Sequence, residues 1–278
     1  MNRRMILSAA GYFLALLAVA VAVLLAFQDR LIYFPQRALD ARPADYGLAA
    51  EELSVETADG VRLTGWWIRG RGETALLYFP GNAGNVSHRL DRARGLVESL
   101  GLDVVLVDYR GYGRSGGKPS EKGLYEDGEA VWRAAAARGF PAGRIVLFGE
   151  SLGGAVAIET ALRRPSRALI LEAPFLSVPA MARAVYPFLP AFLVRTRFDN
   201  GAKIGRISIP KLIVQAERDE VVPPEQTRRL FDLARPPKEY FVIPGAGHND
   251  SYLVGGKPYL DVWRRFLEGA RSGARTRA

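Results

Sequence analysis

Short hydrophobic runs alternate with longer mixed segments along most of the chain. Uninterrupted hydrophobic runs of this kind are typical of strands in a parallel sheet, because helices bury both faces of such a sheet. Only hydrophobic residues occur in the runs that we predict to be strands, which are 75–79, 104–107, 145–148, 168–171, 212–214 and 240–243. Helices are predicted between several of them, at 85–100, 122–138 and 152–163. The pattern favours an α/β fold with a mostly parallel central sheet and helices on both faces.

Two features lie outside this alternation. Residues 53–56 and 61–68 read as strands and flank the turn signal Ala58-Asp59-Gly60, which predicts an antiparallel hairpin ahead of the parallel strands. Residues 175–203 hold three prolines and many hydrophobic residues between two predicted strands, which predicts a small helical cap at about 175–205. We expect most of its hydrophobic residues to bury the cap's own face, and the other candidate role is to line an acyl-binding pocket.

An uncharged, mostly hydrophobic segment occupies residues 5–27. Its 23 residues suffice to span a hydrocarbon core of about 30 Å, so we predict a single-pass membrane anchor, a transmembrane helix, at 1–28. A cleaved signal peptide is the alternative, with a cleavage site near Ala20-Val21-Ala22, but the hydrophobic run continues beyond that site. Positive charges are nearly balanced across the segment, and the leading Arg3 and Arg4 favour a catalytic domain on the extracytoplasmic (periplasmic) side.

The rest of the chain suits one catalytic domain. Residues 29–51 contain Pro35 and Pro43 and little periodicity, which predicts a linker. The α/β domain is expected at 52–270 and a short basic tail at 271–278. The chain has no cysteine, which excludes disulfides, thiolate metal sites and a cysteine nucleophile. We expect neither a metal nor a cofactor.

A net charge of +9 raises the question of a nucleic-acid partner. The basic residues are spread along the chain, without a basic stripe interleaved with aromatic residues, so no nucleic-acid binding is expected. The excess positive charge suits a surface close to anionic lipid headgroups.

Candidate chemistry centres on Gly149-Glu150-Ser151-Leu152-Gly153. This G-x-S-x-G follows a predicted strand and opens a predicted helix, which is the context of a nucleophile elbow, where a sharp turn exposes the serine hydroxyl. A tight turn with an incidental serine is the rival interpretation, and we predict Ser151 as the nucleophile. Residues 111–116 match G-x-G-x-x-G, but their loop continues to Ser120 instead of opening a helix directly, which argues against a dinucleotide site.

A serine nucleophile needs a base, and the base needs an acid to orient it. His248 follows the last predicted strand in a glycine-containing loop and completes the chain order Ser, acid, His. The other histidine, His88, lies early in a predicted helix. The acid is expected in the loop after the fifth predicted strand, where Asp219 is preferred over Glu217, with Glu172 as a further alternative.

The tetrahedral intermediate of acyl transfer needs two N–H donors for its oxyanion. We predict one donor in the backbone of Leu152, the residue after the nucleophile. The second is predicted in the backbone of Asn82, within the glycine-containing loop 79–85 that follows the first predicted parallel strand.

Several stretches resemble the α/β-hydrolase superfamily, and most closely its Bem46-like and ABHD13/ABHD17-like branch. They are 31–35, 79–85, 108–115, 149–154, 219–223 and 247–249. The resemblance implies the α/β-hydrolase fold and a Ser–Asp–His triad, and its D-x-x-V-P pattern falls on Asp219. One departure is Pro80, where many relatives carry histidine, so the resemblance leaves the local geometry of that loop open.

We therefore expect a membrane-anchored serine hydrolase that cleaves an ester or thioester, with a small-molecule or lipid-like acyl substrate and the bilayer as its partners. Two alternatives stay open. One is a serine peptidase on the same fold. The other is a non-catalytic binding protein, against which the intact set of Ser151, Asp219 and His248 argues.

Overall fold

One eight-stranded sheet forms the centre of the computed structural model, which describes residues 12, 15–16, 18–19, 21–23 and 25–275. The strand order is β10-β9-β8-β7-β4-β6-β3-β2. The strands are β2 (Ala50–Glu56), β3 (Arg62–Ile68), β4 (Ala75–Phe79), β6 (Asp103–Val107), β7 (Ile145–Glu150), β8 (Ala168–Glu172), β9 (Lys211–Ala216) and β10 (Lys238–Ile243). Only β3 pairs antiparallel, with β2 and β6. The predicted mostly parallel sheet of an α/β-hydrolase, opened by an antiparallel hairpin, is confirmed.

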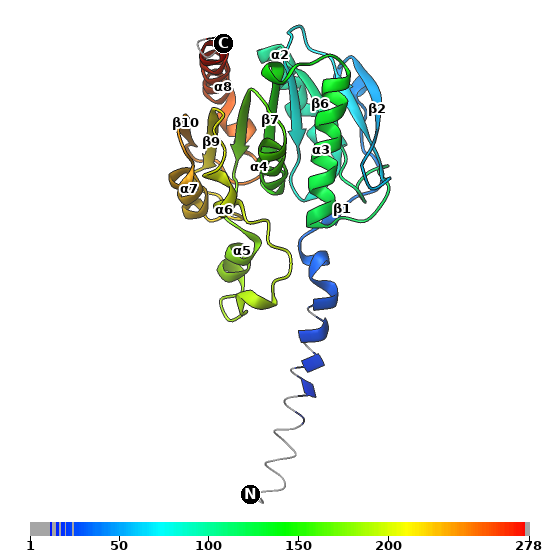
Figure 1. Ribbon diagram of the computed structural model, residues 1–278, viewed down its shortest axis with the longest axis vertical. Helices are drawn as coiled ribbons and strands as arrows, with labels where there is room; N and C mark the ends of the chain where they lie inside the picture. The colour runs from blue at the N-terminus through cyan, green and yellow to red at the C-terminus, as the bar shows by residue number, and fades with distance from the viewer. Residues whose placement is uncertain (1–11, 13–14, 17, 20, 24, 276–278) are drawn as a thin grey trace, which may run out of the picture.

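Helices cover both faces of this sheet (Figure 1). They are α2 (Leu90–Leu100), α3 (Glu121–Ala137), α4 (Leu152–Arg163), α7 (Pro224–Leu233) and α8 (Ser251–Arg275). Side chains of α3, α4 and α7 bury against one face, and those of α2 and α8 against the other. Neighbouring strand residues alternate between the two cores, since Leu77 belongs to the first and Leu76 to the second.

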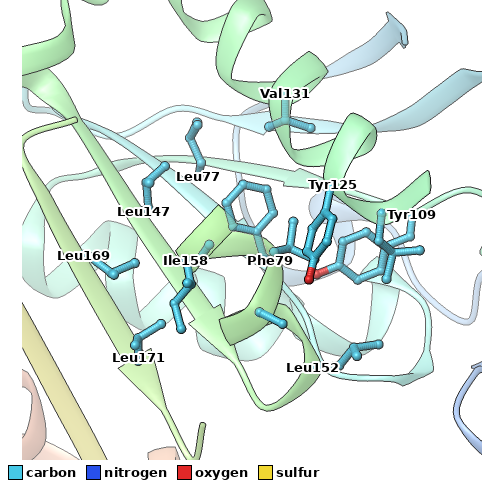
Figure 2. Close-up of a cluster of buried hydrophobic side chains, with 14 of the residues drawn as sticks. Leu77, Phe79, Tyr109, Tyr125, Val131, Leu147, Leu152, Ile158, Leu169 and Leu171 are labelled. Carbon is cyan, nitrogen blue, oxygen red and sulfur yellow. The ribbon is translucent and has the colours of Figure 1, made fainter. Parts of the chain in front are cut away.

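The first core lies between the sheet and helices α3 and α4. Figure 2 shows part of it, in which Leu77 and Leu147 from the strands lie with Val131 of α3 and Ile158 of α4. All four side chains are buried. Strands that are hydrophobic on both faces need such a core on each side, which explains the uninterrupted hydrophobic runs in the sequence.

The predicted helix at 85–100 begins differently from the prediction. Asn85 caps a short 3₁₀ helix, η3 (Val86–Arg89), because its side chain accepts a hydrogen bond from the backbone N–H of Ser87 at 2.9 Å. The α-helix α2 starts only at Leu90. Asparagine competes for nearby backbone donors in this way at the start of a helix.

The segment ahead of the sheet carries regular structure of its own. It contains η1 (Gln28–Leu31), β1 (Phe34–Pro35) and η2 (Pro43–Tyr46). Strand β1 pairs in parallel with β5 (Ala83–Gly84), which lies in the loop after β4. Tyr33 is buried in the first core. These contacts hold the residues that follow the predicted anchor beside the loop at the carboxyl end of β4.

Most of the predicted anchor at 1–28 lies outside the described residues, as do the last residues of the predicted basic tail. The described positions between 12 and 27 are helical. Within the described part of the chain, no helix is both long enough and apolar enough to cross a membrane.

The segment between β8 and β9 contains α5 (Val178–Val185), η5 (Ala191–Leu193) and α6 (Asn200–Ile204). Figure 1 shows α5 at the end of the molecule from which the N-terminal segment also projects. The side chains of Phe198 and Ile204 are buried in the first core. The expectation that most of the hydrophobic residues here bury the cap's own face is wrong for its outer part, where Val185, Tyr186, Phe188 and Phe192 are exposed.

Candidate active site

Ser151 lies on a sharp turn between β7 and α4. Its backbone has φ 51° and ψ −114°, a conformation that residues with a side chain rarely adopt. The turn is held by two backbone hydrogen bonds, from the Ser151 N–H to the carbonyl of Glu172 and from the Gly154 N–H to the carbonyl of Ser151, both at 2.9 Å. Strain of this kind amounts to about 1–3 kcal/mol and clusters at functional sites.

The glycines of the motif are required by close backbone contacts. A Cβ atom on Gly149 would lie 2.4 Å from the carbonyl oxygen of Gly153, and one on Gly153 would lie 1.9 Å from that of Phe79. Both distances are far below van der Waals contact. The elbow therefore packs directly against the end of β4, and this packing brings the loop after β4 to the serine.

His248 and Asp219 contact each other after the last two strands. The Nδ1 atom of His248 lies 2.8 Å from Oδ2 and 2.9 Å from Oδ1 of Asp219. Asp219 Oδ1 also accepts the backbone N–H groups of Val221 and Val222, which fixes the carboxylate. Both side chains are nearly buried. With Nδ1 bound to the carboxylate, the Nε2 atom is the one available for proton transfer.

The other acids named from the sequence have different partners. Glu217 accepts the N–H of Gly245 at 2.7 Å, so it braces the backbone of the histidine loop. Glu172 is buried and contacts Arg92, Ser251 and Tyr259. Of the three candidate acids, Asp219 is the one whose carboxylate bonds to the imidazole of His248.

His88 also lies away from this arrangement. Its Nε2 atom contacts Asp40 Oδ2 at 2.7 Å, between η3 and the segment ahead of the sheet. The partner of His88 is Asp40, whereas the partner of His248 is Asp219, which follows β9. His248 is therefore the histidine that is paired with the predicted acid.

The two predicted oxyanion donors belong to the start of α4 and to the loop after β4. Leu152 is the first residue of α4, where backbone N–H groups have no carbonyl partner within the helix. The backbone carbonyl of Asn82 accepts from the N–H of Phe34 at 3.0 Å and from the hydroxyl of Tyr112 at 2.8 Å. A Cβ atom on Gly81 would lie 3.7 Å from Ser151 Cβ, so this loop lies against the serine.

Pro80, the departure from the family pattern, is part of the same packed loop. Its carbonyl accepts the hydroxyl of Tyr109 at 3.0 Å, and a Cβ atom on Gly153 would lie 2.6 Å from that carbonyl oxygen. The loop is therefore held by backbone contacts that proline can make, since proline lacks a backbone N–H but keeps its carbonyl.

A buried ionic cluster lies beneath the elbow, and it was not predicted from the sequence. The guanidinium of Arg92, on α2, lies 2.8 Å from Glu172 and 3.4 Å from Glu150, the residue before Ser151. Tyr78 donates its hydroxyl to Glu150, and Arg89 lies 3.3 Å from the same carboxylate. Burial raises the pKa of Glu150, but the two guanidinium groups outweigh it and lower that pKa to about 2.

This cluster connects the separate loops of the site. Arg92 Nη2 also lies 3.4 Å from Oγ of Ser251, three residues after His248. Glu172 provides the backbone carbonyl that holds Ser151. The nucleophile turn, the end of β8 and the histidine loop thus share one buried guanidinium. Its sequence signals are a glutamate inside the G-x-S-x-G and an arginine on the helical segment that follows β4.

The acidic surroundings of His248 alter its titration. Burial lowers its pKa, but the hydrogen bond and charge of Asp219, with the charges of Glu150 and Glu220, raise it above the ordinary value of 6.5. A general base must be neutral to accept a proton, so activity should fall as the pH drops through this raised pKa. We expect the acid limb of kcat/KM to have its midpoint above pH 6.5.

Replacing Glu220 with glutamine tests that electrostatic origin. Glu220 Oε2 accepts the backbone N–H of His248 at 3.0 Å, and glutamine keeps an acceptor there while removing the charge. The acid limb should move to lower pH, with the plateau rate retained. The measurement is a pH profile of kcat/KM, with Glu225→Gln, an exposed acid in the first turn of α7, as the matched control. A limb that stays in place, or moves equally in both variants, contradicts this origin.

The part of the chain that the structure describes contains no set of side chains that could bind a metal ion. No group of three or more histidine, aspartate or glutamate side chains there could hold a metal ion. The chemistry that this arrangement can support is acyl transfer, with a serine on a strained turn, an acid–histidine pair and backbone donors at the start of a helix.

Comparison with known proteins bears on the family. A family model described as serine aminopeptidase, S33, matches residues 74–201. An uncharacterised protein of Mycobacterium tuberculosis is 43% identical over 248 residues, covering 86% of this chain and 87% of that protein. Protein bem46 of Schizosaccharomyces pombe is 34% identical, covering 91% of this chain and 90% of that protein. An uncharacterised membrane protein of Saccharomyces cerevisiae is also 34% identical, covering 92% and 94%.

Solved structures agree on the fold. The esterase Pf2001 of Pyrococcus furiosus superposes with a TM-score of 0.71, covering 85% of this chain and 97% of that one, at 20% sequence identity. A likeness at this identity concerns the fold alone. The resemblance seen in the sequence is confirmed by the relatives that match along nearly their whole length. This chain is a member of the α/β-hydrolase superfamily, in its Bem46-like branch.

Proposed function

We propose that this α/β-hydrolase is a membrane-anchored serine hydrolase that cleaves a carboxylic ester or thioester through an acyl-enzyme. The observation that carries the proposal is the His248–Asp219 pair, whose Nδ1 and Oδ2 atoms lie 2.8 Å apart, in a fold that holds Ser151 at φ 51° on a strand–helix turn. Nucleophile, acid and base follow one another in the chain order of this fold. The electrostatic effect of Glu150 on His248 supports the proximity of the histidine to the elbow.

The proposed reaction has two halves. Ser151 Oγ attacks the carbonyl carbon while His248 Nε2 takes its proton, and Asp219 stabilises the resulting imidazolium. The backbone N–H groups of Leu152 and Asn82 stabilise the oxyanion. Collapse expels the alcohol or thiol, which receives the proton from His248. Water then attacks the acyl-enzyme with His248 as base, and the acid product leaves with Ser151 restored.

Steady-state hydrolysis tests the proposal directly. The full-length protein in detergent should hydrolyse p-nitrophenyl esters, and Ser151→Ala should lower kcat by at least about three orders of magnitude. A series from acetate to palmitate, with matching thioesters, then measures the preferred acyl length. Absence of Ser151-dependent turnover on every member of the series would contradict the proposal, and a flat response would count against a dedicated acyl pocket.

Membrane anchoring is the second part of the proposal. Its supports are the uncharged hydrophobic segment at 5–27 and the yeast relative that is named a membrane protein. We expect the protein to stay in the pellet when membranes from expressing cells are extracted with alkaline carbonate. Release into the supernatant would contradict the anchor without bearing on the chemistry of Ser151.

Peptide hydrolysis is the second candidate, because the matching family model is described as a serine aminopeptidase. An amide leaving group requires protonation by His248 before it departs, whereas an alkoxide or thiolate leaves more readily. Aminoacyl p-nitroanilides measured beside the esters separate the two. A larger kcat/KM on the anilides would replace the esterase proposal with a peptidase.

A further inference from the structure

A group of large hydrophobic side chains is exposed at the outer end of the segment between β8 and β9. Val185 is 59% exposed, Tyr186 44%, Phe188 82% and Phe192 83%. The rings of Tyr186 and Phe188 pack edge to face with centroids 6.3 Å apart. We call these four residues the cap tip. Contiguous exposed hydrophobic residues of this kind mark contact with a partner protein or a membrane.

The cap tip belongs to a segment that is bonded to residues 25–29, which follow the other described helical positions of the N-terminal segment. These described helical positions, between 12 and 27, are called the N-terminal helix. The backbone N–H of Arg195 donates to Gln28 Oε1 at 2.8 Å, and its guanidinium donates to the carbonyl of Leu25 at 3.3 Å. Thr196 contacts Asp29 at 3.4 Å. Figure 1 shows both segments projecting from the same end of the molecule. The two are therefore fixed side by side by contacts at their bases.

The N-terminal helix presents the same kind of surface as the cap tip. Its described residues Leu16, Val19, Val23 and Phe27 are 48–70% exposed. Two neighbouring elements thus carry large hydrophobic side chains that no part of the described structure covers. The hydrophobic run of the N-terminal segment extends over residues 5–27. A run of this length matches the hydrocarbon core of a bilayer.

Charge around the cap tip indicates which partner fits. The segment 178–198 contains no aspartate or glutamate and three arginines, all exposed: Arg183, Arg195 and Arg197. Arg30, at the base of the N-terminal helix, is exposed as well. Exposed aromatic and aliphatic residues flanked by arginines match the interface of a bilayer that contains anionic lipid. The acids that contact this segment, Asp29 and Glu121, bond to Thr196 and to the backbone of Arg197, outside the cap tip itself.

We propose that the cap tip inserts into the bilayer interface beside the N-terminal anchor, as a second membrane contact. This inference rests on the membrane anchoring in the proposed function. It deepens that function by identifying the source of the substrate. The loop that contains Asn82 is bonded to the chain just after the anchor, through Asn82 Nδ2 to the carbonyl of Ile32 at 2.9 Å. This contact ties the loop beside Ser151 to the part of the chain that the anchor joins. Within this proposal, the substrate class is an acyl ester or thioester embedded in the bilayer.

A chain without cysteine permits a direct test. Phe188→Cys and Phe192→Cys, in the full-length protein, are labelled with an environment-sensitive fluorophore and reconstituted in phosphatidylcholine/phosphatidylglycerol vesicles. Gly143→Cys serves as the control. Gly143 is exposed in η4 (Ala142–Arg144), at the opposite end of β7, and a Cβ atom there meets nothing within 4 Å. Quenching by nitroxide-labelled lipid reports contact with the bilayer.

Both cap labels should shift to the blue and be quenched by the nitroxide lipid, whereas the label at position 143 should show neither effect. Cap labels as weakly quenched as the control overturn the proposal. A blue shift without lipid quenching would place the cap tip against another protein molecule and overturn it equally. Co-flotation with vesicles and turnover of a short soluble ester, measured on the same samples, show separately whether the anchor and the hydrolase activity hold.

Activity provides a second readout. The double variant Phe188→Asp, Phe192→Asp should keep its kcat/KM on p-nitrophenyl acetate and lose at least about tenfold on a long-chain ester presented in vesicles, because it disfavours the bilayer contact. Equal activity of the double variant and the wild-type protein on the vesicle substrate would contradict the inference.

Discussion

Replacing Asp219 with asparagine should lower kcat for ester hydrolysis by about three to four orders of magnitude. The carboxylate that contacts His248 Nδ1 at 2.8 Å both orients the ring and stabilises its protonated form. Asparagine is nearly the same size and can still accept the backbone N–H groups of Val221 and Val222, but it cannot balance the imidazolium charge. The loop should therefore keep its structure while the chemical step slows.

The neighbouring acids supply the controls for this result. Glu217→Gln removes a charge from the same loop, but Glu217 bonds to the N–H of Gly245 rather than to the imidazole, so kcat should change by no more than about threefold. Melting temperatures of both variants show that they are folded. If Glu217→Gln is the inactive variant and Asp219→Asn keeps its activity, the assignment of the acid is wrong.

Replacing Arg92 with methionine should destabilise the fold by about 3–5 kcal/mol. Arg92 is 8% exposed, and its guanidinium lies 2.8 Å from Glu172, which is 1% exposed. Methionine fills much of the space but leaves the buried carboxylate without its cation. The urea dependence of unfolding, followed by fluorescence in detergent, measures the loss.

Arg94→Met, two residues further along the same helix, is the matched control. Arg94 pairs with Asp91 at 2.7 Å, with both side chains 43% exposed, so its loss should change stability by less than about 1 kcal/mol. Equal effects of the two substitutions would contradict a special role for Arg92. A stable Arg92→Met with unchanged kcat would contradict the link between the cluster and the loops of the site.

The sequence predicts this fold well where the determining contacts are local. Strand β7, the turn at Ser151 and helix α4 follow from a hydrophobic run, a glycine motif and a periodic segment that are adjacent in the chain. The sheet strands follow likewise from runs such as 104–107. His248 could be favoured over His88 by its place after the last strand, although the choice among the acids depended mainly on family resemblance.

Features that depend on distant segments escape prediction. Arg92 meets Glu172 and Ser251 across 80 and 159 residues of chain, and no local pattern announces such contacts. Helix α8 contains Gly256 with φ 46° and Pro258, which interrupt its periodicity. Helix α7 is only ten residues long and buries few hydrophobic side chains. The exposure of the cap tip could not be predicted either, since large hydrophobic residues are ordinarily expected to be buried.

The identity of the nucleophile is the central claim, and the site of covalent modification tests it most directly. Full-length protein is treated with a fluorophosphonate, digested with trypsin and analysed by tandem mass spectrometry. We predict one phosphonyl adduct, on Ser151 within the peptide Ile145–Arg163, and no adduct in protein whose histidine has been changed by His248→Ala. An adduct on any other serine, or an unmodified Ser151 in protein that hydrolyses esters, would contradict the account.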